Sequence, residues 1–122
     1  MVTSVEATFA ALGDPVRSTI VDRLAQSDAT VSELSALFDM SFQGVSQHLA
    51  VLERAGLVTR HRDGRHRPAR LSPQPLVEAL DWMESRRRRL EERYQRLDTL
   101  LATLTDETHQ PATPTTAIKE NS

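Results

Sequence analysis

The chain of 122 residues contains no cysteine. This absence excludes disulfides, thiolate metal ligands, cysteine redox switches and cysteine nucleophiles together. The sequence also lacks an apolar run of about 18 residues, so we expect no membrane-spanning helix and no membrane partner. Its first residues show no basic stretch followed by an apolar one, so no secretory signal is expected. These absences predict a single-domain cytoplasmic protein.

Aromatic residues are scarce as well, at 4%, so a core must be built mainly from Leu, Val, Ile and Ala. The net charge is only −2, but it is unevenly distributed. Residues 1–40 hold two arginines and six acidic residues, whereas residues 41–70 hold six arginines and two acidic residues. Salt limits the reach of each charge to about 10 Å, so a local basic block matters more to a polyanion than the total does. Residues 41–70 therefore favour contact with nucleic acid.

Two short helices are predicted before residue 30. Val5, Phe9 and Leu12 recur at helical spacing, and Gly13 ends that helix. Asp14-Pro15 then opens a second helix, with Asp as the N-cap and Pro at the first helical position.

A helix-turn-helix is predicted over residues 30–54. Thr30 and Glu33 match a capping box that opens its first helix. Ser41 caps the second helix, which ends at Ala55-Gly56. The apolar residues expected on the buried sides of the two helices are Leu34, Leu37, Phe38, Val45, Leu49 and Leu52.

The second of these helices presents a polar outer face. Its members are Gln43, Gln47, Ala50 and Arg54, with Ser46 at the flank. Glutamine can pair with adenine, serine suits several base edges, and alanine leaves room for close approach. This chemistry predicts a helix that reads DNA bases; the alternative is a face that is merely solvated.

A basic hairpin is predicted directly after this helix. Residues 57–62 and 65–71 form its strands, Asp63-Gly64 is a two-residue turn signal, and Pro68 makes the second strand an edge. Its arginines are Arg60, Arg62, Arg65, Arg67 and Arg70. Arginines near a hairpin tip can contact phosphates or enter the minor groove, although a solvated basic ribbon is the alternative. His61 and His66 could face each other across the hairpin, but two ligands do not complete a zinc site.

A long helix is predicted from Ser72-Pro73 to about Leu104. Its residues at alternating steps of four and three form a heptad seam. They are Leu76, Leu80, Met83, Arg87, Leu90, Tyr94, Leu97, Leu101 and Leu104. A helix of about 30 residues is about 45 Å long, too long to bury against so small a domain. The seam therefore predicts a dimer. Residues 1–104 make up the expected domain, and the polar, Pro- and Thr-rich residues 105–122 predict a disordered tail.

Several stretches in combination resemble the ArsR family of winged-helix regulators. They are ALGDPVRSTIVDRLA, TVSELSALFDMSFQGVSQHLAVLERAGLV, the arginine-rich hairpin and ALDWME. The resemblance implies a mainly helical winged helix-turn-helix with a small β-hairpin, acting as a homodimeric repressor with its first and last helices at the dimer interface. It also implies that residues near the start of the second helix of the pair meet the major groove. These are Ser41, Phe42, Gln43, Ser46 and Gln47. The helical wheel places His48 beside the buried face, which suggests a packing or phosphate-contact residue.

The same resemblance raises the question of a sensor. Many members of the family bind metals through two cysteines, where this chain has Thr30 and Ser32. Others bind zinc through Asp, His and Glu on the last helix, and residues 72–104 contain no histidine. We therefore predict no metal site, no cofactor and no metal response; this branch of the family includes autoregulators. Whether a small-molecule effector exists stays open.

The sequence thus predicts a homodimeric transcription regulator that acts as a repressor and binds duplex DNA at an imperfect palindrome. The expected dimer contacts are Val5, Phe9, Leu12, Leu76, Leu80, Met83, Leu90, Tyr94, Leu97 and Leu101. The expected DNA contacts are Ser41, Phe42, Gln43, Ser46, Gln47, His48, Arg54, Arg60, Arg62, Arg65 and Arg67. The alternative is a winged-helix protein-interaction module without DNA binding, which the wing arginines disfavour. No enzyme is expected, because Ser46 and His48 lie two residues apart on a helix and do not face each other.

Overall fold

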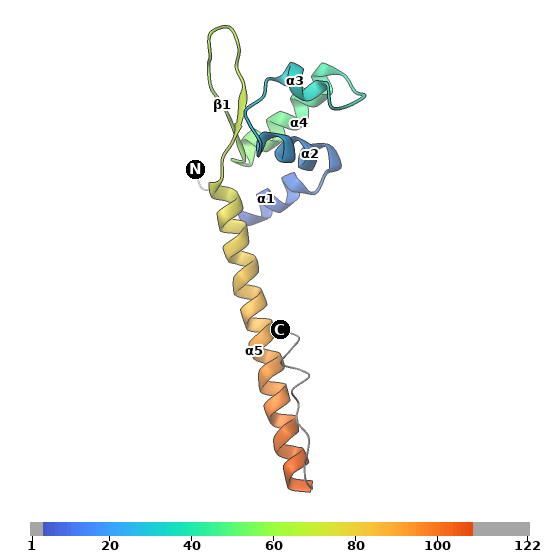
Figure 1. Ribbon diagram of the computed structural model, residues 1–122, viewed down its shortest axis with the longest axis vertical. Coiled ribbons are helices and arrows are strands. Elements are labelled where there is room, and N and C mark those ends of the chain that lie inside the picture. The colour runs from blue at the N-terminus through green and yellow to red at the C-terminus, as the bar shows by residue number, and fades with distance from the viewer. Residues whose placement is uncertain (1–3, 109–122) are drawn as a thin grey trace. The chain divides into compact units, whose positions relative to one another are not determined.

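The computed structural model describes residues 4–108. Its elements follow the order expected of a winged helix-turn-helix (Figure 1). They are α1 (Val5–Leu12), α2 (Pro15–Leu24), α3 (Val31–Ser35), α4 (Phe42–Arg54), β1 (Val58–Arg60), β2 (Ala69–Leu71) and α5 (Gln74–Thr108). The predicted fold class, mainly helical with a two-stranded wing and a long last helix, is confirmed. The chain divides into two units, residues 1–83 and 84–122, which are described separately below.

Side-chain caps set the starts of the three helices that follow α1. The Asp14 carboxylate accepts hydrogen bonds from two backbone N–H groups in the first turn of α2, at 2.9 and 3.1 Å. Thr30 and Glu33 form the predicted capping box at the start of α3. The Ser41 hydroxyl accepts the N–H of Gly44 at 2.9 Å at the start of α4. All three predicted caps are therefore present. Each one satisfies backbone N–H donors that the first turn of a helix leaves unpaired.

The core of the first unit joins α2, α3, α4 and the start of the wing. Its fully buried large residues include Ile20, Leu34, Val45, Leu49, Leu52 and Leu57. Leu37, which was expected on the buried side of α3, is 46% exposed. This expectation was wrong because α3 already ends at Ser35, so Leu37 no longer follows the helical face.

The wing is an antiparallel hairpin in which Val58 pairs with Leu71 and Arg60 with Ala69. Near its tip, the backbone groups of Asp63 and His66 exchange two hydrogen bonds of 2.9 and 3.0 Å. The two-residue loop is therefore residues 64–65, one residue later than predicted. Arg65 consequently lies in the loop and not on a strand.

Gly64 occupies the first loop position with a φ of 66°, a conformation that favours glycine at the start of a two-residue hairpin turn. The N–H of His61 donates to the carbonyl of Pro68 at 3.2 Å. His61 thus lies opposite Pro68, so the two wing histidines do not face each other as had been considered. Pro68 itself precedes β2, where its missing N–H disturbs no strand.

A further β-bridge joins the wing to the loop before α3. The N–H of Ala69 donates to the carbonyl of Ala29 at 2.7 Å, and the N–H of Ala29 donates back at 3.2 Å. Both alanines are buried. The base of the hairpin is therefore fixed to the helix-turn-helix by paired backbone hydrogen bonds.

The second unit, as far as it is described, is the part of α5 from Glu84 to Thr108. The helix ends four residues later than expected, so residues 105–108 are helical, and the rest of the predicted tail lies outside the described residues. Large apolar residues of the predicted seam are 44–62% exposed on it. They are Leu90, Tyr94, Leu97 and Leu101. Between residues 4 and 108, none of the helices is long and apolar enough to cross a membrane.

Candidate nucleic-acid interface

Helix α4 has one buried face and one polar face, as predicted. Its apolar residues Val45, Leu49 and Leu52 are buried in the core, which fixes the rotation of the helix. Gln43, Gln47 and Arg54 are exposed on the other side, and Ser46 and Ala50 are half-buried at its margin. Because the buried residues anchor α4, the amide side chains are presented outward from a rigid element.

The first turn of α4 adds a hydroxyl and an aromatic ring to this surface. Ser41 uses its oxygen to accept the helix-capping hydrogen bond, so its own O–H remains available as a donor. The Phe42 side chain is 57% exposed. The neighbouring Leu37 and Met40 are also exposed, at 46% and 37%, and the sequence analysis had not placed them there. The surface around the start of α4 is therefore partly apolar.

The wing contributes positive charge. Arg62, Arg65 and Arg67 are exposed, and none of the three forms a hydrogen bond or ion pair through its side chain with another described residue. Arg60 is half-buried, and its Nε donates to the carbonyl of Arg67 at 3.0 Å. Three of the four predicted wing arginines thus have uncommitted guanidinium groups. The fourth, Arg60, links the two sides of the hairpin through its hydrogen bond to Arg67.

Arg70 has a different role from the arginines at the tip. Its Nε and Nη2 lie 3.1 and 3.0 Å from one carboxylate oxygen of Asp28, and Nε2 of His61 lies 3.7 Å from the same oxygen. This cluster neutralises part of the charge at the base of the wing. No local pattern in the sequence indicates this cluster, because the arginine and the aspartate are 42 residues apart.

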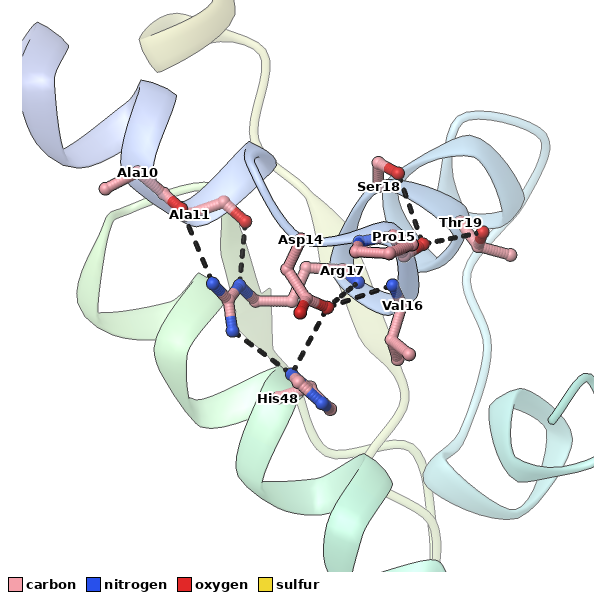
Figure 2. A network of polar contacts seen from close by, with 9 residues as sticks. All are labelled: Ala10, Ala11, Asp14, Pro15, Val16, Arg17, Ser18, Thr19 and His48. Carbon is pink, nitrogen blue, oxygen red and sulfur yellow. Dashed lines mark hydrogen bonds and ion pairs between the residues drawn. The ribbon is translucent and has the colours of Figure 1, made fainter. Parts of the chain in front are cut away.

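A polar network connects α4 to the turn between α1 and α2 (Figure 2). The Arg17 guanidinium donates from Nε to the carbonyl of Ala11 at 2.7 Å and from Nη2 to that of Ala10 at 3.4 Å. Its Nη1 lies 3.1 Å from Nδ1 of His48 on α4. The same ring nitrogen lies 3.7 Å from Oδ2 of Asp14. Arg17 therefore contacts both the end of α1 and helix α4.

The two acidic helix caps have lowered pKa values. The backbone N–H of Arg17 is the main reason that the pKa of Asp14 lies below its usual range, and the neighbouring N–H of Val16 adds to this effect. The backbone N–H of Thr30 lowers the pKa of Glu33 in the same way. Both carboxylates are therefore stabilised in their charged form by helix N-termini.

The predicted dimer residues of the first unit divide into two groups. Leu12 and Leu76 pack partly against the core of their own protomer, and Val5 is half-buried. Phe9 is 37% exposed and meets Trp82 edge-to-face, with ring centroids 5.7 Å apart. Leu80 and Met83 are 56% and 45% exposed.

On the second unit, the one charged member of the seam is compensated within its own helix. Arg87 forms ion pairs with Glu84 at 3.0 Å and with Glu91 at 2.7 Å. These carboxylates raise the pKa of Arg87. The arginine thus has its partners on α5 itself and leaves the apolar seam residues exposed beside it.

Thr30 and Ser32 occupy the positions where the resemblance to ArsR regulators implies metal-binding cysteines in other proteins. The Thr30 hydroxyl accepts the backbone N–H of Glu33 in the capping box, and Ser32 is exposed. Within residues 4–108, no group of three or more His, Asp or Glu side chains is arranged to hold a metal ion.

Comparisons with known proteins agree with this arrangement. The family model described as "Bacterial regulatory protein, arsR family" matches residues 14–60. The transcriptional repressor SdpR of Bacillus subtilis is 32% identical over 75 residues, which cover 62% of this chain and 83% of SdpR. An ArsR-like transcriptional regulator from Rhodococcus sp. RHA1 aligns with a TM-score of 0.72 at 26% identity, over 79% of this chain and 91% of its own.

A further solved structure is the homodimeric winged helix-turn-helix DNA-binding domain of Mb0332 from Mycobacterium bovis, a possible ArsR-family regulator. It aligns with a TM-score of 0.56 at 25% identity, over 72% of this chain and 82% of its own. The family consists of transcription regulators, so the protein is not an enzyme. The matched residues run from the N-cap of α2 through the helix-turn-helix to the end of β1. The chain belongs to the ArsR family of DNA-binding helix-turn-helix transcription regulators.

Proposed function

We propose that this protein is a homodimeric repressor in which α4 reads base edges in the major groove and the wing arginines contact phosphates. The observation that carries the proposal is the exposed polar face of α4, anchored by a buried apolar face and followed directly by a wing with three uncommitted arginines. Positioning by phosphate contacts and specification by base contacts is the usual division of work in such complexes.

Gln43 and Gln47 are the main candidates for base reading. Both are exposed on a helix whose rotation is fixed by the buried Val45 and Leu49, so both side chains project from one fixed side of α4. A glutamine amide can donate to and accept from adenine in one bidentate contact. Ser41, Phe42 and Ser46, together with Arg54 at the far end of the helix, complete the proposed surface.

The exposed seam of α5 supports a homodimer. Leu90, Tyr94, Leu97 and Leu101 are large apolar side chains exposed at heptad spacing, and burying them against a second copy is favourable. The homodimeric state of the Mb0332 domain supports the same assembly. A two-fold dimer presents two copies of α4, so the operator is an imperfect palindrome with half-sites about 10–10.5 base pairs apart or a multiple of this.

We further propose that the repressor does not respond to metals and that it regulates its own gene. The first proposal is supported by the absence of cysteine from the sequence and by the engagement of Thr30 in a helix cap. The second rests on the resemblance of the chain to the branch of the family that includes autoregulators.

One titration series tests these proposals. The full-length protein is titrated against the DNA upstream of its own gene, a scrambled duplex, and a duplex selected from a randomised pool. Tight binding to the selected duplex supports sequence-specific recognition, and tight binding to the upstream DNA supports autoregulation. Equal affinity for all three duplexes would refute base reading. Release of the selected duplex by low-micromolar zinc, cadmium or arsenite would refute the absence of a metal response.

A further inference from the structure

The contact between Arg17 and His48 determines where the imidazole carries its proton. A guanidinium group only donates hydrogen bonds, so the ring nitrogen facing it must accept. That nitrogen is Nδ1, which lies 3.1 Å from Nη1 of Arg17. The distance of 3.7 Å from Nδ1 to Asp14 is too long for a hydrogen bond, so the contact with Arg17 determines which ring nitrogen carries the proton. The neutral ring therefore carries its proton on Nε2.

The Nε2 end of the same ring faces away from the network. Figure 2 shows the second ring nitrogen of His48 on the side away from Asp14 and Arg17. Among the described residues, Nε2 has no hydrogen-bond partner, and it is not one of the buried polar atoms that lack one. The His48 side chain is 23% exposed. The structure thus presents an accessible, oriented N–H donor on the recognition helix.

The position of His48 on α4 suggests what this donor meets. His48 follows the exposed Gln47 and lies about 100° further around the helix, half-buried between the polar face and the buried face. A major groove about 12 Å wide just admits a helix of about 10–12 Å diameter, so the flanks of such a helix lie close to the phosphate backbones. Neutral backbone and side-chain N–H donors are common partners of these phosphates.

We propose that His48 donates its Nε2–H to a DNA phosphate, and that Arg17 is the positioning residue that holds the ring for this contact. The proposal rests on the DNA-binding function proposed above. It also gives the polar network a purpose beyond packing, because Arg17 fixes the donor relative to the carbonyl groups of Ala10 and Ala11 at the end of α1. The ring is thereby oriented from two elements at once.

Two substitutions at His48 distinguish the contribution of Nδ1 from that of Nε2. The amide of His48→Asn reaches the position of Nδ1, so it can still accept from Arg17 but offers no outward donor. The longer amide of His48→Gln reaches the position of Nε2, so it keeps the outward donor and loses the Arg17 contact. We expect the asparagine variant to bind the selected duplex about tenfold more weakly per protomer, as fits one hydrogen bond to a charged acceptor. The glutamine variant should bind more tightly than the asparagine variant but more weakly than the wild-type protein, because it keeps the outward donor and loses the arginine that orients it.

A phosphate scan identifies the contact directly. Single methylphosphonates, which remove the charge and weaken the acceptor at one phosphate, are placed in turn along each strand of the selected duplex. At one position per half-site, the wild-type protein should lose about tenfold in affinity, whereas His48→Asn should lose little more. A general weakening of α4 would lower affinity equally at every position, so it cannot produce this coupling. If every methylphosphonate weakens the wild-type protein and His48→Asn to the same extent, the proposed contact is refuted, even where the glutamine variant binds well.

The positioning role of Arg17 is tested with a matched control variant. Arg17→Lys keeps the charge but cannot serve two α1 carbonyls and the ring together, so the coupling at the same phosphate should shrink. Arg23→Lys is the control, because Arg23 also lies on α2 but its guanidinium group hydrogen-bonds to Ser27, in the turn after its own helix, and not to His48. Nitrogen chemical shifts of the His48 ring should show the proton on Nε2 in the wild-type protein. A proton on Nδ1 would overturn the proposal, and failure to bind any duplex would instead refute the proposed function itself.

Discussion

The wing arginines allow a quantitative prediction about the salt dependence of DNA binding. Arg62, Arg65 and Arg67 are the exposed wing cations with uncommitted guanidinium groups in the described chain. Arg60 is left out because its Nε is bound to the backbone of the hairpin. A dimer therefore brings about six such arginines to the duplex. If each neutralises one phosphate, the slope of log K against log salt is about −5.

Replacing Arg65 and Arg67 by glutamine removes four of these contacts from the dimer. The slope should then be about −2. Between about 50 and 200 mM salt, the wild-type affinity should fall about a thousandfold, and that of the double variant only about tenfold. Both a selected and a scrambled duplex should show this change, because phosphate contacts carry no sequence information.

Fluorescence anisotropy over a salt series measures both slopes. Arg70→Gln is the control, since it also removes positive charge from the hairpin, one charge per protomer, but from a side chain already paired with Asp28. Its slope should stay close to that of the wild-type protein. An unchanged slope in the double variant would show that the wing does not contact the phosphates, and a loss confined to the selected duplex would show that the wing reads sequence.

Three further predictions concern specificity, assembly and acid stability. Gln47→Ala should cost about 1–3 kcal/mol on the selected duplex and much less on a scrambled one, and an equal loss on both would refute base reading by this residue. Leu97→Arg places a charge in the exposed seam of α5 and should shift the dimer toward monomer in sedimentation experiments, whereas an intact dimer would show that the seam is not the interface. The lowered pKa of Asp14 means that its charged form stabilises the fold above the ordinary carboxyl pKa, and that this contribution disappears as the pH falls through the folded-state pKa. Asp14→Asn should therefore have a lower melting temperature than the wild-type protein at neutral pH, and the difference between the two melting temperatures should vanish in acid. A difference that does not change with pH would contradict this reasoning.

Local signals in the sequence were sufficient to predict most of the fold. The caps at Asp14, Thr30 and Ser41 depend on residues within three positions of one another, so their chemistry can be read from the sequence directly. The hairpin was also predicted, but its loop was placed one residue too early. The turn residues allow either placement, and the pairing along the strands decides between them.

The parts that sequence analysis missed depend on contacts between distant residues. Arg17 reaches His48 across 31 positions, and no periodicity or cap signal connects the two. The helical wheel placed His48 beside the buried face, but it could not identify the partner that orients the ring. Leu76 appeared as one member of a uniform seam, whereas the structure packs it partly against the protomer's own core.

The bridge between Ala29 and Ala69 divides the wing into two mechanical regions. Tilting the base of the hairpin would break two backbone hydrogen bonds in a buried site, so the amides of both alanines should exchange with solvent only on deep opening of the domain. From Arg62 to Arg67 the ribbon is exposed and its backbone is held together by the Asp63–His66 pair. This outer part can adjust to grooves of different width while its root stays still.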